Sequence, residues 1–95
     1  MSVQFEQDPR KAWANLLKHG VSFEEALTVF ADPLARIFDD ETHSAREPRE
    51  IVIGHSAERW LVLVSFTTRG AAVRLFSARK ATRVERMDYE ENVGT

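Results

Sequence analysis

Basic residues concentrate in the last third of the chain. Between positions 69 and 86 the only acid is Glu85. The basic residues of this stretch are Arg69, Arg74, Arg79, Lys80, Arg83 and Arg86. The planar fork of Arg matches two oxygens of a phosphate and keeps its charge near neutral pH. Although the formal net charge of the chain is -2, this stretch could present a positive surface that binds phosphate groups.

Arg74 and the Arg79–Lys80 pair are the strongest candidates for such contacts. Arg74 lies between small and apolar residues of a strand-like run, so a rigid sheet would fix its direction. Its alternative role is a salt bridge or an exposed strand charge. Arg79 and Lys80 precede Thr82, a predicted helix N-cap, and a helix N-terminus attracts phosphate through its free N–H groups. A solvated basic corner would explain the same pair without a ligand.

Proton transfer near neutral pH needs a His, or a Lys whose pKa is lowered. Lys18 and His19 stand side by side before Gly20, where they also suit the negative end of a helix dipole. His43 follows three acids in a polar loop, and these carboxylates would raise its pKa and favour the charged form. A loop histidine without a function is an equally simple reading of His43. His55 is expected in a turn.

Two helices are predicted near the N-terminus. Asp8 and Pro9 suit the N-cap and the first position of a helix, and Gly20 suits its left-handed C-cap. The apolar residues at helical spacing are Ala12, Trp13, Leu16 and Leu17, which predict a packed stripe with Trp13 in the core. Ser22 and Glu25 form a capping box for a second helix, which places Phe23 in the core and ends before Asp32.

The rest of the chain reads as strands followed by one helix. Apolar runs predict strands over 3–6, 34–38, 51–53, 60–66 and 71–77, and the short turns between the last three favour antiparallel pairing. In the last run Arg74 shares a face with Ala72 and Phe76. Thr82 and Glu85 form a capping box that opens the final helix. The sequence therefore predicts a single α+β domain over residues 1–95, with an antiparallel sheet, two N-terminal helices and one C-terminal helix.

Composition excludes several other classes. The chain has no Cys, so disulfides and thiolate metal sites are excluded, which suits a cytoplasmic location. Its N-terminus does not read as a signal peptide, and its longest apolar run, 60–64, is too short to cross a bilayer. The chain has no Gly-rich phosphate loop, and the acidic loop over 39–43 matches no calcium or zinc motif. Neither a metal nor a cofactor is expected.

Three stretches of the chain stand out together. The first runs from Phe5 to Lys11 and continues from Asn15 to Ala26. The second is His43-Ser44 followed by Glu47 and Arg49, and the third runs from Arg74 to Thr82 with Glu85, Arg86 and Tyr89 after it. In order and spacing these stretches resemble the BrnT family of ribonuclease toxins across nearly the whole chain.

The resemblance implies a RelE-like toxin fold and a metal-independent endoribonuclease that arrests translation and growth. It also implies a protein partner, a BrnA-like ribbon-helix-helix antitoxin. In such systems the toxin–antitoxin complex represses its own promoter, and the operator DNA is contacted only through the antitoxin.

The resemblance gives the candidate residues provisional roles. The catalytic candidates it favours are Arg74, Arg79, Lys18, His19 and His43. The substrate-binding candidates are Lys80, Arg69 and Tyr89, whose ring could stack on a base or pack in the core. The alternative is a non-catalytic module that binds a protein through a basic sheet face. Convergence of Arg74 and Arg79 with a His or Lys on one concave patch would favour the enzyme. A lone DNA-binding regulator is less expected, because no helix carries a dense basic face.

Overall fold

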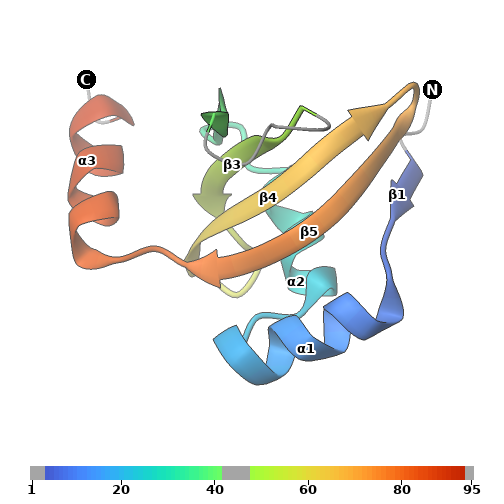
Figure 1. The fold of residues 1–95 in the computed structure, drawn as a ribbon. Helices are drawn as coiled ribbons and strands as arrows, with labels where there is room; N and C mark the ends of the chain where they lie inside the picture. The colour runs from blue at the N-terminus through green and yellow to red at the C-terminus, as the bar shows by residue number, and fades with distance from the viewer. Residues whose placement is uncertain (1–3, 42–47, 94–95) are drawn as a thin grey trace.

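The structure is a computed structural model that describes residues 4–41 and 48–93. This part of the chain is built around one mixed sheet (Figure 1). Its strand order is β1-β5-β4-β3-β2. The strands are β1 Gln4–Glu6, β2 Arg36–Asp39, β3 Glu50–His55, β4 Leu61–Arg69 and β5 Ala72–Lys80. Strands β2 to β5 pair antiparallel, as their short connections require, whereas β1 lies parallel to β5.

The helices begin where the capping residues place them. In α1 (Pro9–His19) the Asp8 carboxylate accepts a hydrogen bond from the Arg10 N–H, and Gly20 ends the helix at a φ of 70°. In α2 (Phe23–Val29) the Ser22 hydroxyl accepts from the Glu25 N–H. The third helix, α3 (Arg83–Val93), opens on the Thr82–Glu85 capping box. No helix in the described ranges is long and apolar enough to cross a membrane.

Helices α1 and α2 cover one face of the sheet, which we call the covered face. The main hydrophobic core lies between them, and Phe23, Ala26 and Val29 of α2 are buried in it. The sheet contributes alternate residues of three strands, namely Val52, Val62, Val64, Phe66, Val73, Leu75 and Ala78. The expectation that Phe23 is a core residue is confirmed.

The opposite face of the sheet, which we call the open face, is covered much less. Helix α3 leaves the end of β5 and stands away from α1 and α2 (Figure 1). Its Tyr89 is 5% exposed and packs in a small second cluster with Ile53, Leu61 and Leu63. The rest of the helix is largely exposed, including Val84 and Met87. This agrees with the weak apolar stripe of its sequence.

Helix α1 packs through a different face from the one expected. Trp13 is 62% and Leu17 is 69% exposed, whereas Asn15 is 6% exposed, so the prediction of an apolar stripe with Trp13 in the core is wrong. The cause lies in β5, whose pairing with β1 ends at Arg74. Beyond that point the edge of β5 needs hydrogen-bond partners. The Asn15 amide donates to the Ala78 carbonyl at 2.7 Å and accepts from the Ala78 N–H at 3.0 Å, which fixes the rotation of the helix.

Candidate active site

A β-bulge in β5 determines which arginines face the open side. Ser65 pairs with Ser77 and Phe66 with Leu75, so Phe76 is an extra residue without a partner on β4. Arg74 and Arg79 are five positions apart, and regular alternation would place them on opposite faces. The extra residue reverses the alternation once. Since Leu75 and Ala78 belong to the core of the covered face, Arg74 and Arg79 both lie on the open face.

A polar cavity of about 310 Å³ lies on the open face beside Arg79, and we call it the arginine cavity. Its lining residues are Asp40, Arg49, Ile51, Leu63, Ser65, Ser77 and Arg79. Two guanidinium groups, two hydroxyls and one carboxylate, that of Asp40, therefore border a recess with an aliphatic floor. Such an arrangement of donors can bind a phosphate group and a neighbouring ribose hydroxyl.

Arg79 is held in place by the first turn of α3. Its two terminal nitrogens donate to the two carboxylate oxygens of Glu85, at 2.7 and 2.8 Å. The same carboxylate accepts from the Thr82 N–H, so the residue that caps α3 also orients the arginine. The hydrogen bonds from Arg79 lower the pKa of Glu85 from 4.5 to about 2, against the opposing effect of partial burial. The sequence predicted the cap and missed the ion pair.

Replacing Glu85 by Gln tests this ion pair, because Gln keeps the capping box but has no charge. The folded-state pKa of Glu85 lies below its ordinary value, so its stabilising effect is complete above pH 4.5 and is lost as the pH falls towards 2. We expect Glu85→Gln to lower the free energy of unfolding by about 1–2 kcal/mol at pH 7. Urea unfolding at pH 7 and near pH 2 measures this. An equal deficit at both pH values would contradict the ion pair.

Arg49 reaches the arginine cavity over the ring of the bulged residue. Its Cζ lies 4.0 Å from the centroid of the Phe76 ring, within cation–π range. The Nζ of Lys11, from α1, lies 5.1 Å from the same centroid. Phe76 therefore brings two further cations to the edge of β5. Sequence reasoning missed this cluster, because the bulge that places Phe76 beside Arg49 and Lys11 cannot be recognised from the residue types.

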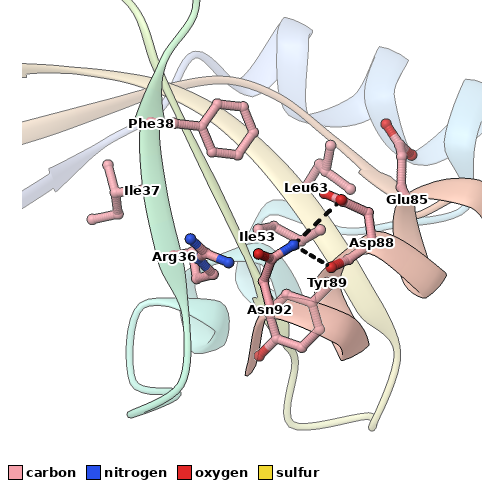
Figure 2. A pocket seen from close by; sticks show the side chains of 9 residues that line it. All are labelled: Arg36, Ile37, Phe38, Ile53, Leu63, Glu85, Asp88, Tyr89 and Asn92. Atoms are coloured by element: carbon pink, nitrogen blue, oxygen red, sulfur yellow. Dashed lines mark hydrogen bonds between the residues drawn. The ribbon is translucent and has the colours of Figure 1, made fainter. Parts of the chain in front are cut away.

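A second cavity, of about 400 Å³, lies between β2 and α3 (Figure 2). Its lining residues are Arg36, Ile37, Phe38, Ile53, Leu63, Glu85, Asp88, Tyr89 and Asn92. It adjoins the arginine cavity, because Leu63 lines both and Glu85 contacts Arg79. Inside it the Asn92 amide donates to the Asp88 side chain and carbonyl. Its charged lining residues are one arginine, Arg36, and two acids, Glu85 and Asp88, so the arginine cavity, with two arginines and one acid, is better suited to phosphate.

Tyr89 holds α3 against the rest of the domain at this second cavity. Its hydroxyl donates to the Leu34 carbonyl at 3.1 Å, and its ring packs edge-on against His55. Burial raises the pKa of Tyr89. These contacts account for the residue as part of the small core. Stacking of Tyr89 on a base stays a prediction.

Other sequence candidates lie away from the arginine cavity. Lys80 pairs with Val62 on the covered face, and its Nζ lies 3.7 Å from the Trp60 ring centroid. Lys18 and His19 end α1, which packs against the covered side, and neither residue lines the cavity. Arg69 is exposed at the end of β4. His43 lies outside the described residues. The structure therefore places Arg74 and Arg79 on the open face and brings Arg79 together with Arg49 at the arginine cavity. Arg74 does not line that cavity, and among the described residues no His or Lys lines it, so the expected convergence with a His or Lys is not found there.

Comparison with known proteins decides the family. The family model for the ribonuclease toxin BrnT, of type II toxin–antitoxin systems, matches residues 8–85. This chain belongs to the BrnT family. The match takes in every residue that lines the arginine cavity, from Asp40 to Arg79, and also Glu85, which holds Arg79 in place. The membership identifies a ribonuclease toxin of a type II system, as the sequence resemblance predicted.

The fold agrees with that of a BrnT toxin of known structure. The 1.1 Å crystal structure of the Brucella abortus ribonuclease toxin BrnT superposes with a TM-score of 0.68 at 24% sequence identity. The match covers 86% of this chain and 100% of that chain. No curated protein sequence matches the chain. The α+β expectation is thus confirmed, with a sheet that is antiparallel except for β1.

Proposed function

We propose that the open face of the sheet binds RNA and that the chain cleaves it as a metal-independent endoribonuclease. The observation that carries this proposal is the arginine cavity, where Arg79 is fixed by Glu85 opposite Arg49 and two serines. A ribose 2′-hydroxyl would attack the adjacent phosphorus, and the bond from phosphorus to the 5′-oxygen of the next nucleotide would break. The products are a 2′,3′-cyclic phosphate and a free 5′-hydroxyl.

Arg79 is the proposed clamp on the scissile phosphate. Glu85 holds both terminal nitrogens, and Nη1 also donates to the Lys80 carbonyl at 3.3 Å. The Nε–H and the second N–H of Nη2 stay available to an anion, so the guanidinium needs no reorganisation as negative charge builds up on the phosphate. Arg74 lies along the same strand and the same face, where it would contact a neighbouring phosphate. Both groups thus act by position and charge.

The proton transfers are assigned to the candidates that the sequence supplied. One group must take the proton of the 2′-hydroxyl, and another must protonate the departing 5′-oxygen. We propose Lys18, His19 and His43 for these steps. Since Lys18 and His19 do not line the arginine cavity, RNA would have to extend around the edge of β5 to meet them. Replacing each by Ala and comparing the pH–rate profiles would assign the roles.

The cleavage reaction itself is the direct test. Purified chain, freed from any partner, is incubated with RNA in excess EDTA, and the new ends are analysed by mass spectrometry. We expect cleavage that EDTA does not inhibit, with 2′,3′-cyclic phosphate ends, because arginine groups supply the charge that a metal would otherwise provide. RNA left intact by demonstrably folded protein would contradict the enzyme and favour a binding module. Cleavage abolished by EDTA and restored by Mg²⁺ would contradict metal independence alone.

The partner we propose is a BrnA-like ribbon-helix-helix antitoxin encoded beside the toxin gene. In this arrangement the antitoxin would silence the toxin in the cytoplasm, and its DNA-binding part would bring the complex to its own operator. Free toxin would then cleave RNA and arrest translation and growth. Membership of a type II toxin–antitoxin family supports a protein partner.

A further inference from the structure

The outer face of α1 carries large apolar side chains that are well exposed to solvent. Trp13 is 62% exposed, Leu17 is 69% exposed and Leu16 is 38% exposed. Their spacing of three and four residues places them side by side on the helix surface. The inner face of α1 is already fixed by Asn15, so the helix cannot rotate to bury them. A contiguous apolar patch of this kind marks an interaction site more often than a chance exposure.

A groove lies next to this apolar patch. A groove of about 470 Å³ runs between α1 and the start of α2, and its apolar walls come from Pro9, Trp13, Leu16 and Phe23. Glu24 stands at its α2 side. A groove between two helices fits a rod-like partner, such as a third helix, better than it fits a flat surface.

Charge around the patch selects the chemistry of that partner. Helix α1 contains Arg10, Lys11 and Lys18 and no carboxylate. Arg10 lies three residues before Trp13 and seven before Leu17, so it belongs to the same surface stripe. All three cations are exposed. An apolar stripe bordered by cations is complementary to an amphipathic helix with acidic flanks.

We propose that the outer face of α1, formed by Arg10, Trp13, Leu16 and Leu17, is the docking site for an acidic amphipathic helix of the antitoxin. The identity of the partner rests on the proposed function. A second copy of this chain is disfavoured, because a symmetric contact would bring the cations of two α1 helices together. A membrane is disfavoured by the recessed shape of the groove.

The site lies on the covered side of the sheet, away from the arginine cavity. A helix bound at α1 would therefore hold the antitoxin without itself occupying the cavity. It follows that substitutions at Trp13 and Leu17 should change affinity for the antitoxin and leave RNA cleavage by free toxin intact. This separates the docking site from the arginine cavity.

Trp13 fluorescence provides the test. In a Trp60→Phe background Trp13 is the remaining tryptophan, and the probe is the purified protein encoded by the gene beside the toxin gene. We expect its addition to shift Trp13 emission to shorter wavelength, because the indole leaves water. Trp13→Ala and Leu17→Ala should each weaken binding about tenfold or more, since large apolar anchors carry most interface energy. Arg10→Glu should also weaken it.

Two substitutions in α3 serve as controls for the docking site. Val84→Ala and Met87→Ala remove exposed apolar groups of α3 and should change affinity by no more than about twofold. Unchanged Trp13 emission in a complex that forms normally would overturn the docking site. A blue shift caused by anionic lipid vesicles or by self-association of the toxin would also overturn it, in favour of those occupants. If no complex forms, the docking proposal fails, and the RNA assay separately decides whether the chain is a ribonuclease.

Discussion

Arg79→Ala is expected to lower kcat/KM for RNA cleavage about 10²–10³-fold, the usual effect of removing a preorganised donor from a developing negative charge. The loss should be large for two reasons. The guanidinium borders the arginine cavity, and its removal also leaves the carboxylate of Glu85 facing the phosphate without a counter-ion. Initial rates on a defined oligoribonucleotide measure the effect. Growth after induction of the variant in cells provides a second readout, in which arrest should be relieved.

Companion variants separate the fork of Arg79 from its charge. Arg79→Lys keeps the charge and loses the planar pair of donors, so it should recover only part of the activity. Arg79→Ala combined with Glu85→Gln removes the uncompensated carboxylate and should be more active than Arg79→Ala alone. Arg74→Ala should weaken binding of a non-cleavable oligonucleotide and reduce its salt dependence by the equivalent of about one phosphate contact.

The control for these variants is Arg86→Ala. Arg86 is an exposed arginine of α3 that lines neither cavity, and its loss should leave cleavage within about twofold of the parent, as expected for a rim charge. Circular dichroism and thermal unfolding must show that every variant folds. If Arg74→Ala and Arg79→Ala both stayed as active and as toxic as the parent protein, the catalytic face would have to be sought elsewhere.

Local signals explain why much of the fold could be predicted from sequence. A cap depends on residues within one turn, so Asp8, Ser22 and Thr82 located the three helix starts correctly. Alternating or continuous apolar runs likewise located every strand of the described residues, although β3, β4 and β5 extend further than expected. His55, expected in a turn, is the last residue of β3. Whether two strands pair through a short turn is also a local matter, and the antiparallel part of the sheet followed from it.

Long-range features could not be read in the same way. The rotation of α1 depends on Ala78, 63 residues beyond Asn15, whose backbone groups need the Asn15 amide. A prediction from hydrophobic spacing counts only apolar residues and ignores a buried Asn. For this reason it placed Trp13 in the core. The parallel pairing of β1 with β5 joins residues 4–6 to residues 72–74 in the same non-local way.

The candidate site shows the same division. Arg74 and Arg79 stood out by residue type, yet their common face depends on a bulge that leaves no mark in the sequence around Phe76. Glu85 was correctly recognised as a cap, but its second role as the partner of Arg79 needed three-dimensional contact. The kind of chemistry a site can perform is therefore predictable from its residue types. Which side chains come together at one site depends on the pairing register of the strands.

Asn15→Ala is expected to have the largest effect on stability. The side chain is buried and satisfies three backbone groups, since it donates to the carbonyls of Val21 (2.9 Å) and Ala78 and accepts from the Ala78 N–H. Its removal leaves all three without their partner, at a cost of about 1–3 kcal/mol for a buried group left unsatisfied. With partial relief by water, we expect the free energy of unfolding to fall by about 3–5 kcal/mol in total.

That loss is a large part of the stability of a small domain, which is typically about 5–15 kcal/mol. Thermal unfolding should therefore show the Tm of Asn15→Ala lowered by at least about 12 °C. Asn92→Ala is the matched control, because Asn92 is exposed and bonds only within α3, and its effect should stay below about 1 kcal/mol.

Asn15→Asp distinguishes the hydrogen bonds from simple packing, since the shape of the side chain is kept. The carboxylate can still accept from the Ala78 N–H, but it cannot donate to either carbonyl and would face both of them with a negative charge. Burial and the two facing carbonyls also raise the pKa of such a carboxyl, so its protonated form, which can donate to a carbonyl, should be tolerated better. We therefore expect Asn15→Asp to be strongly destabilised at pH 7 and to lose less stability, relative to the parent, near pH 4. Equal destabilisation at both pH values would mean that packing alone, and not the amide bridge to β5, holds α1 in place.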